Sequence, residues 1–140
     1  RIIKPYFDLA VGSDGLLRVV NPGALRIEVY TFQGHLELFW PQQRLPGIEG
    51  FFGCCNPAQF AILADGRFVT AEKGIARVKV YSAQGQFECV VAGPDQLDLT
   101  SDQVIADVAA DGRNRILILD PKAGSVRIFE HKQANSGAEQ

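Results

Sequence analysis

Short apolar runs separated by turn residues fill most of the chain. The runs are rich in Val, Ile, Leu and aromatic side chains and are short, which is typical of β-strands. In the first part of the chain they cover residues 7–11, 16–20, 26–30 and 35–39, and in the second part residues 58–63, 67–71, 76–81 and 86–91. The pattern predicts an all-β protein.

The runs belong to three consecutive copies of one pattern. Asp8-Leu9-Ala10-Val11 recurs as Asp107-Val108-Ala109-Ala110, at an offset of 99 residues. Arg26-Ile27-Glu28-Val29-Tyr30 recurs as Arg77-Val78-Lys79-Val80-Tyr81, at an offset of 51 residues. A repeat of this length, with four strands in each copy, predicts the blades of a β-propeller.

Dipeptides that end in glycine separate several of the strands. Asp14-Gly15, Asp65-Gly66, Gln33-Gly34 and Gln84-Gly85 are predicted hairpin turns in which glycine supplies a positive φ. In the third strands, Ile27 and Val29 alternate with charged residues, which predicts one buried face and one face in water. First strands such as 60–63 are apolar throughout and are predicted to be covered on both faces.

The copies resemble NHL repeats. That family has an apolar first strand, an Asp-Gly turn, a second strand, a loop with Asn or Asp, and an R-I-x-V-[FY] third strand, as in residues 9–30, 60–81 and 108–129 here. The resemblance implies three blades, at about 5–40, 56–92 and 104–130, within residues 1–130, and a polar tail over 131–140. The middle copy departs from it at Glu72-Lys73-Gly74, predicted as a solvated loop tip, and the third departs at Ser125.

Three blades do not close a ring, because propellers have at least four and NHL rings usually six. The third copy lacks a fourth strand, and residues 1–4 are a candidate for a spare outer strand. We expect a partner to complete the ring: a missing N-terminal half of the same protein, or a second copy of the chain that gives three plus three blades. The absence of Met and the start at Arg1 favour a processed or truncated piece.

The charge and hydrophobicity of the chain argue against some classes of partner. The 140 residues are 46% hydrophobic and 21% charged, with a net charge of −2 and both signs mixed along the chain. This predicts no basic surface for nucleic acid or anionic lipid. No apolar run approaches the roughly 20 residues that span a bilayer, so no membrane insertion is expected.

The connection over residues 41–56 carries the candidate chemistry. It ends in Cys54-Cys55-Asn56 directly before a first strand, which in a propeller places these residues near the channel as ligand-binding candidates. The two cysteines could pack or form an ordinary disulfide, form a strained vicinal pair with a redox role, or bind a soft metal with Cys89 or His35. Cys89 is predicted on an outer strand, and His35 as an exposed strand start.

Two repeated charges have structural interpretations. Asp8 and Asp107 occupy the same repeat position and are predicted to accept hydrogen bonds from strand amides, with a channel-facing, ligand-binding Asp107 as the alternative. Arg26 and Arg77 also recur and are predicted to pair between blades.

The function predicted from these observations is a non-catalytic scaffold that binds a protein or ligand, with no cofactor and no catalytic residue. Two alternatives stay open. One is half of a six-bladed metal-dependent lyase or lactonase, and the other is a redox-responsive subunit that uses Cys54 and Cys55.

Overall fold

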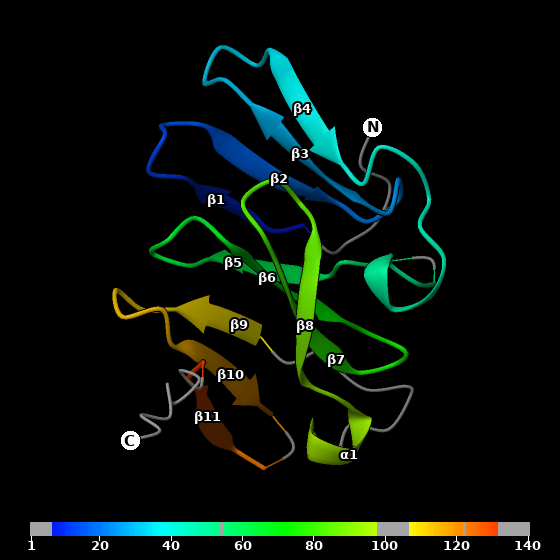
Figure 1. The fold of residues 1–140 in the computed structure, drawn as a ribbon, viewed down its shortest axis with the longest axis vertical. Coiled ribbons are helices and arrows are strands. Elements are labelled where there is room, and N and C mark those ends of the chain that lie inside the picture. Colours follow the sequence, from blue (N-terminus) through cyan, green and yellow to red (C-terminus); the bar gives the residue numbers. More distant parts are fainter. Residues whose placement is uncertain (1–6, 54, 98–106, 122, 132–140) are drawn as a thin grey trace, which may run out of the picture.

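The computed structural model describes residues 7–53, 55–97, 107–121 and 123–131, and these residues form three antiparallel sheets (Figure 1). Sheet 1 contains β1 (Leu9–Val11), β2 (Leu17–Asn21), β3 (Arg26–Tyr30) and β4 (Leu36–Trp40). Sheet 2 contains β5 (Gln59–Ile62), β6 (Phe68–Glu72), β7 (Arg77–Tyr81) and β8 (Phe87–Ala92). Sheet 3 contains β9 (Asp107–Ala110), β10 (Ile116–Asp120) and β11 (Ser125–Phe129). The helical elements are short: η1 (Gly47–Glu49) and α1 (Pro94–Leu97).

The predicted all-β class is confirmed. Within each sheet, strands that follow one another in the chain are neighbours, so each sheet is an antiparallel meander. In the described part of the chain β11 pairs with β10 alone, which agrees with a third copy that lacks a fourth strand. Residues 1–4, the candidate spare strand, lie outside the described residues. Among the described helices none is long and apolar enough to cross a membrane.

The first hairpin of each sheet shows that the three copies are in register. Its closing backbone bond joins Gly12 to Leu16, Leu63 to Arg67, and Asp111 to Arg115, which repeats the offsets of 51 and 99 residues. Gly15 and Gly66 have φ values of 75° and 87°, as the turn dipeptides predicted. In sheet 3 the same position is Asn114, with φ 59°, since Asn tolerates the left-handed region better than other non-glycine residues.

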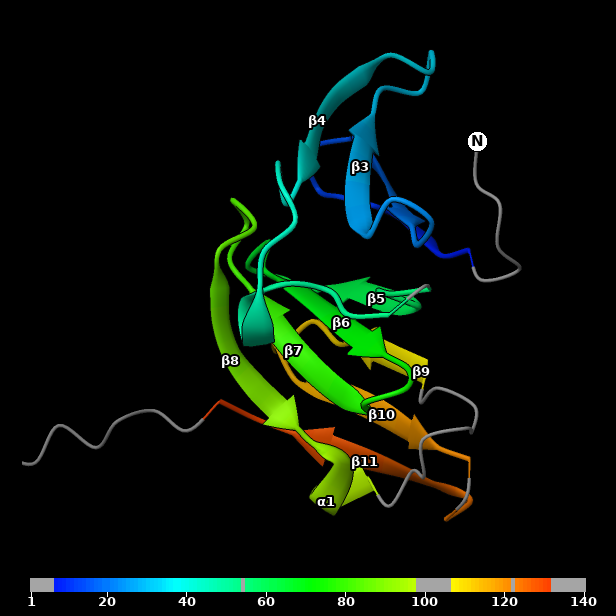
Figure 2. The same ribbon diagram turned by 90° about the vertical axis from the view of Figure 1, so that its right-hand side faces the viewer.

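The sheets are stacked one on another (Figures 1 and 2). The first strands β1, β5 and β9 lie side by side, and β8 lies on the opposite side of the stack. Each sheet therefore has a rear face, directed toward the preceding sheet, and a forward face, directed toward the next one.

Two apolar clusters fill the junctions between the sheets. Between sheets 1 and 2 the buried residues are Val20, Ile27, Trp40, Phe51, Phe60, Phe68 and Tyr81. Between sheets 2 and 3 they include Ala61, Val69, Ala71, Val78, Val80, Val108, Ile116 and Ile118. Because side chains alternate across a strand, sheet 2 supplies one face to each cluster.

Two predictions about exposure are wrong in part. In β3 and β7 the face predicted to be wet is buried, because Glu28 and Lys79, at the positions predicted to be in water, are 4% and 0% exposed. Lys79 is covered because the rear face of sheet 2 meets a polypeptide connection as well as sheet 1. Phe60 and Ala61 are buried as predicted for a first strand, but Leu9 and Val11 of β1 are about half exposed.

Candidate functional site on the connection between sheets 1 and 2

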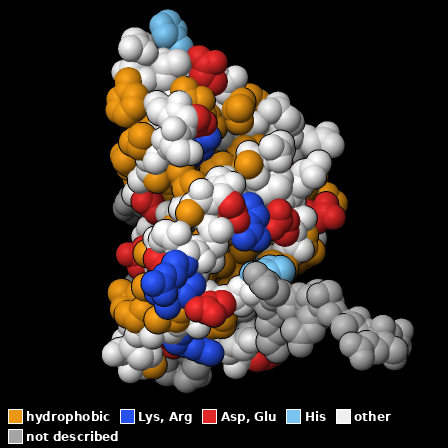
Figure 3. All heavy atoms as spheres, turned by 60° about the vertical axis from the view of Figure 1, so that its left-hand side comes forward, with side chains coloured by type: hydrophobic (Ala, Val, Ile, Leu, Met, Phe, Trp, Pro, Cys, Tyr) orange, Lys and Arg blue, Asp and Glu red, His pale blue; other side chains and the backbone are white. Residues whose placement is uncertain are grey.

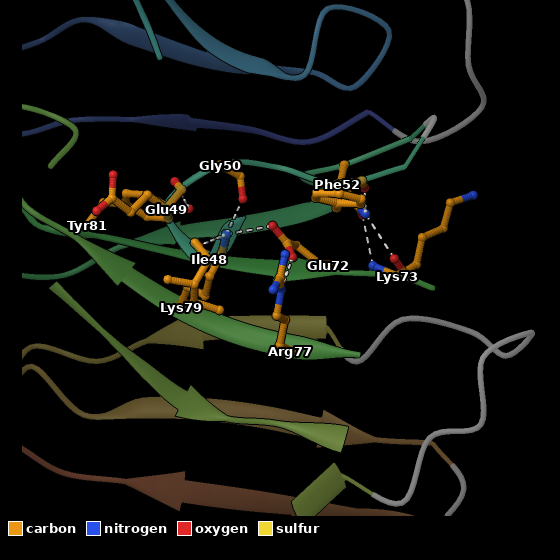
Figure 4. Close-up of polar contacts among 10 residues, drawn as sticks. Ile48, Glu49, Gly50, Phe52, Glu72, Lys73, Arg77, Lys79 and Tyr81 are labelled. Carbon is orange, nitrogen blue, oxygen red and sulfur yellow. Dashed lines mark hydrogen bonds and ion pairs between the residues drawn. The ribbon is translucent and has the colours of Figure 1, made fainter. Parts of the chain in front are cut away.

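A buried ionic cluster lies on the rear face of sheet 2 (Figure 4). The last residue of β6, Glu72, and the first residue of β7, Arg77, are register partners, and Lys79 follows two positions along β7. The Lys79 Nζ atom lies 2.7 Å from Glu72 Oε1, and Arg77 Nε donates to Glu72 Oε2. The prediction that Glu72 lies at a solvated loop tip is wrong, since this residue is 2% exposed.

The Lys79 ammonium group binds the connection between the sheets. It donates to the backbone oxygens of Ile48 at 3.0 Å and Gly50 at 2.6 Å. Together with Glu72 these contacts match the three N–H donors of the group. Burial lowers the pKa of Lys79, and the Glu72 carboxylate opposes that shift. The Lys79 ammonium group therefore binds residues 48–50 to sheet 2.

Tyr81 extends the same contact surface. Its hydroxyl donates to the backbone oxygen of Glu49 at 3.0 Å. Its ring packs against Trp40 and Phe51, with centroid separations of 5.1 Å and 5.6 Å. Burial raises the pKa of the Tyr81 phenol, so the hydroxyl stays a donor across the ordinary pH range.

Asn56 fixes the far end of the connection. Its side-chain oxygen accepts the backbone N–H of Lys73 at 2.8 Å, and its amide nitrogen donates to the backbone oxygens of Lys73, at 2.9 Å, and Phe52. The residue is 2% exposed. In this structure the amide of Asn56, predicted as a ligand-binding candidate, joins the connection to the β6–β7 turn.

The cysteines occupy different environments. Cys54 lies outside the described residues, and Cys55 beside it is buried. Cys89 lies on β8, an outer strand as predicted, and the residue is exposed. Partial desolvation of the thiol, and then the charge of Glu88, raise its pKa. His35 is exposed at the start of its strand, also as predicted. Among the residues that can be placed, no three His, Cys, Asp or Glu side chains gather as a metal site would need.

Asp8 and Asp107 accept strand amides, as predicted. Asp8 accepts the N–H of Leu9 at 2.9 Å and, from the next sheet, the N–H of Phe60 at 2.8 Å. Asp107 is exposed and accepts the N–H of Val108 at 2.9 Å. The pKa of Asp8 is raised mainly by burial, and the charge of Asp107 adds to the shift. Asp8 therefore joins sheet 1 to the first strand of sheet 2.

Charges at the strand ends are paired within sheets. The prediction of pairing between blades is wrong for Arg26 and Arg77, which bind Glu28 and Glu72 of their own sheets. The first hairpins carry further pairs, namely Asp14–Arg18, Asp65–Arg67 and Asp111–Arg115. Figure 3 shows acidic and basic side chains mixed among hydrophobic ones on the side of the molecule where these turns lie.

The outer side of the connection is hollowed. A depression of about 450 Å³ is lined by Arg44, Leu45, Pro46, Gly47, Phe51, Phe52 and Gly53. Phe51 is buried beneath it, whereas Phe52 is 56% exposed. Volumes in this range hold small ligands. Arg44, Phe51 and Phe52 were not predicted to line a site, although the two aromatic residues between Gly50 and Gly53 are a usable signal.

No protein-family model matches this sequence, and no curated protein matches it either.

Proposed function

We propose that the three sheets are blades of an NHL-type β-propeller that acts as a non-catalytic binding scaffold. Three features support the propeller: the meander order in each sheet, the recurrence of turns and strands at fixed offsets, and the side-by-side first strands β1, β5 and β9. Four-stranded meanders repeated about a common axis are the defining arrangement of that fold.

The observation that carries the binding role is the attachment of Ile48, Gly50 and Asn56 of the connection to sheet 2. Removing a lysine from water is costly unless the charge is paired and hydrogen-bonded. Here Lys79 is fully buried, and two of its contacts are carbonyl oxygens of the connection. Asn56 provides a second attachment, through the backbone N–H and the backbone oxygen of Lys73 in the β6–β7 turn. A site held in shape before its ligand arrives loses less entropy on binding.

The lining of the hollow indicates the class of ligand. Phe51, Phe52, Leu45 and Pro46 offer apolar surface, and Arg44 offers a cation at the edge. An apolar or aromatic group that bears a carboxylate fits both features, as at the C-terminus of a peptide. Arginine binds carboxylates through two parallel N–H donors.

N-acetylphenylalanine is a suitable probe, titrated into the labelled protein and followed by NMR. We expect shifts at Gly47 and Gly53 that saturate, and weaker binding of the uncharged N-acetylphenylalanine amide. Phe52→Ala should abolish saturation, whereas Phe32→Ala, which removes an exposed ring from the β3–β4 turn, should not. Equal binding by all three proteins, or shifts spread over the whole chain, would rule out the hollow as the site.

A further inference from the structure

The forward faces of the three sheets are equivalent position by position. At offsets of 51 and 99 residues, Val20, Ile27 and Val29 of sheet 1 correspond to Ala71, Val78 and Val80 of sheet 2 and to Leu119, Val126 and Ile128 of sheet 3. In sheets 1 and 2 these side chains are at most 2% exposed, because the next sheet covers them. In sheet 3 they are 44–56% exposed. Sheet 3 thus presents a complete forward face with no cover in the described part of the chain.

On the rear faces, the uncovered sheet is sheet 1 and not sheet 3. Leu9 of sheet 1 corresponds to Phe60 of sheet 2 and Val108 of sheet 3. Phe60 and Val108 are buried against the preceding sheet, but Leu9 is 50% exposed and Val11, on the same face, 54%. Their register partners on β2 are Val19, which is 6% exposed, and Leu17, which is partly buried, so the exposed apolar part of the rear face lies on β1.

We infer that the forward face of sheet 3 binds the rear face of sheet 1 of a second copy of this chain. The chain carries both halves of the junction that it already forms twice internally, and large uncovered apolar faces are unfavourable in water. The contact is heterologous, since different surfaces of the two copies meet. Two such contacts give a closed assembly of six sheets, and this closure rests on the proposed propeller arrangement.

A polar feature also repeats at this junction. Asp8 uses its second carboxylate oxygen to accept the Phe60 N–H of the following sheet. Asp107 holds the equivalent position in sheet 3 and accepts its own strand amide in the same way as Asp8. Its exposed carboxylate lies at the edge of the forward face, where the first strand of the second copy would arrive.

The test is to measure the mass of the purified chain by sedimentation and native mass spectrometry. Concentrations up to about 0.1 mM are used, because a specific interface of ordinary affinity forms a complex in this range. We expect a dimer. Val126→Lys on the forward face and Val11→Lys on the rear face should each shift the protein to monomer. Ile75→Lys, at an equally exposed position on the β6–β7 turn, should remain dimeric. Melting curves verify that each variant is folded.

Mixing the two monomeric variants distinguishes this contact from its alternatives. A Val126→Lys copy keeps an intact rear face and a Val11→Lys copy an intact forward face, so the mixture should form a one-to-one dimer. A monomeric wild-type chain, or a dimer that only Val126→Lys disrupts, would overturn the inference, the latter because sheet 3 would then pair with itself. The Val126→Lys monomer should still bind N-acetylphenylalanine, so failure here and failure of the hollow are separate results.

Discussion

Lys79 Nζ and Glu72 Oε1 lie 2.7 Å apart, with side chains 0% and 1% exposed. The ion pairs Asp14–Arg18, Asp65–Arg67 and Asp111–Arg115 of the hairpins are partly exposed. The Lys79–Glu72 pair lies where a connection covers part of the rear face of sheet 2. The pair specifies where the connection lies more than it stabilises the fold. A buried ion pair often contributes no more to stability than a matched apolar pair, but an arrangement that leaves one of its charges unpaired is strongly unfavourable.

Lys79→Met should therefore destabilise the protein by about 3–5 kcal/mol, since it leaves Glu72 with Arg77 alone and two carbonyls of the connection without a donor. Urea denaturation measures this loss. Glu72→Leu should be at least as destabilising, because it leaves two cations, Lys79 and Arg77, without their shared carboxylate. Adding Lys79→Met to Glu72→Leu should recover part of that second loss, because only Arg77 then lacks a partner. Arg113→Met, on an exposed turn, should stay within about 0.5 kcal/mol of wild type. Equal effects of Lys79→Met and Arg113→Met would contradict the buried-pair account.

Asn56→Ala should loosen the connection locally. It removes the acceptor of the Lys73 N–H and the donor to the Lys73 oxygen, at an expected cost of about 1–3 kcal/mol. Hydrogen exchange should show faster exchange of the Lys73 amide, while the amides of β10 stay protected. A uniform change across all three sheets would show instead that Asn56 supports the whole fold.

Gly34 and Gly85 form a matched pair of probes, because they occupy equivalent turns with φ values of 87° and 82°. A Cβ at position 34 meets nothing within 4 Å, whereas at position 85 it would lie 2.7 Å from Trp40 Cγ. Gly34→Ala should cost roughly 1–2 kcal/mol for the left-handed backbone alone. Gly85→Ala should cost clearly more, since Trp40 is packed in the junction between sheets 1 and 2. Thermal unfolding of the two variants would disprove this packing if their Tm values coincide.

Asp14 gives a prediction for acid pH. Its pKa is lowered to about 2, chiefly by hydrogen bonds from Arg18. A carboxyl whose pKa is depressed on folding contributes stability above its unfolded pKa of about 3.9 and loses that contribution as the pH falls toward 2. Asp14→Asn should lower Tm slightly at pH 7, and the difference from wild type should vanish near pH 2. A difference that grows on acidification would show that the shift has the opposite sign.

The strands, the turns and the spacing of the copies were predictable, because they depend on local chemistry that recurs along the chain. Local preferences of a few neighbouring residues specify the Asp-Gly turn at residues 65–66 and the alternation of residues in β7. These preferences do not depend on how the sheets pack. The third hairpin turn was not predicted, because Asn114 stands where the first two copies have Gly15 and Gly66. Asn can adopt the same positive φ.

Burial of the charged residues could not be predicted in the same way. Glu28, Lys79 and Arg127 share a repeat position, and nothing in the local pattern distinguishes the lysine that becomes fully buried. What buries Lys79 is the connection that returns over sheet 2 some thirty residues earlier in the chain. Local preferences along the chain are sufficient to specify which segments become strands and that they repeat. Which faces are covered depends on the packing of the sheets and of the connection, because coverage is a property of what packs against a strand and not of the strand itself.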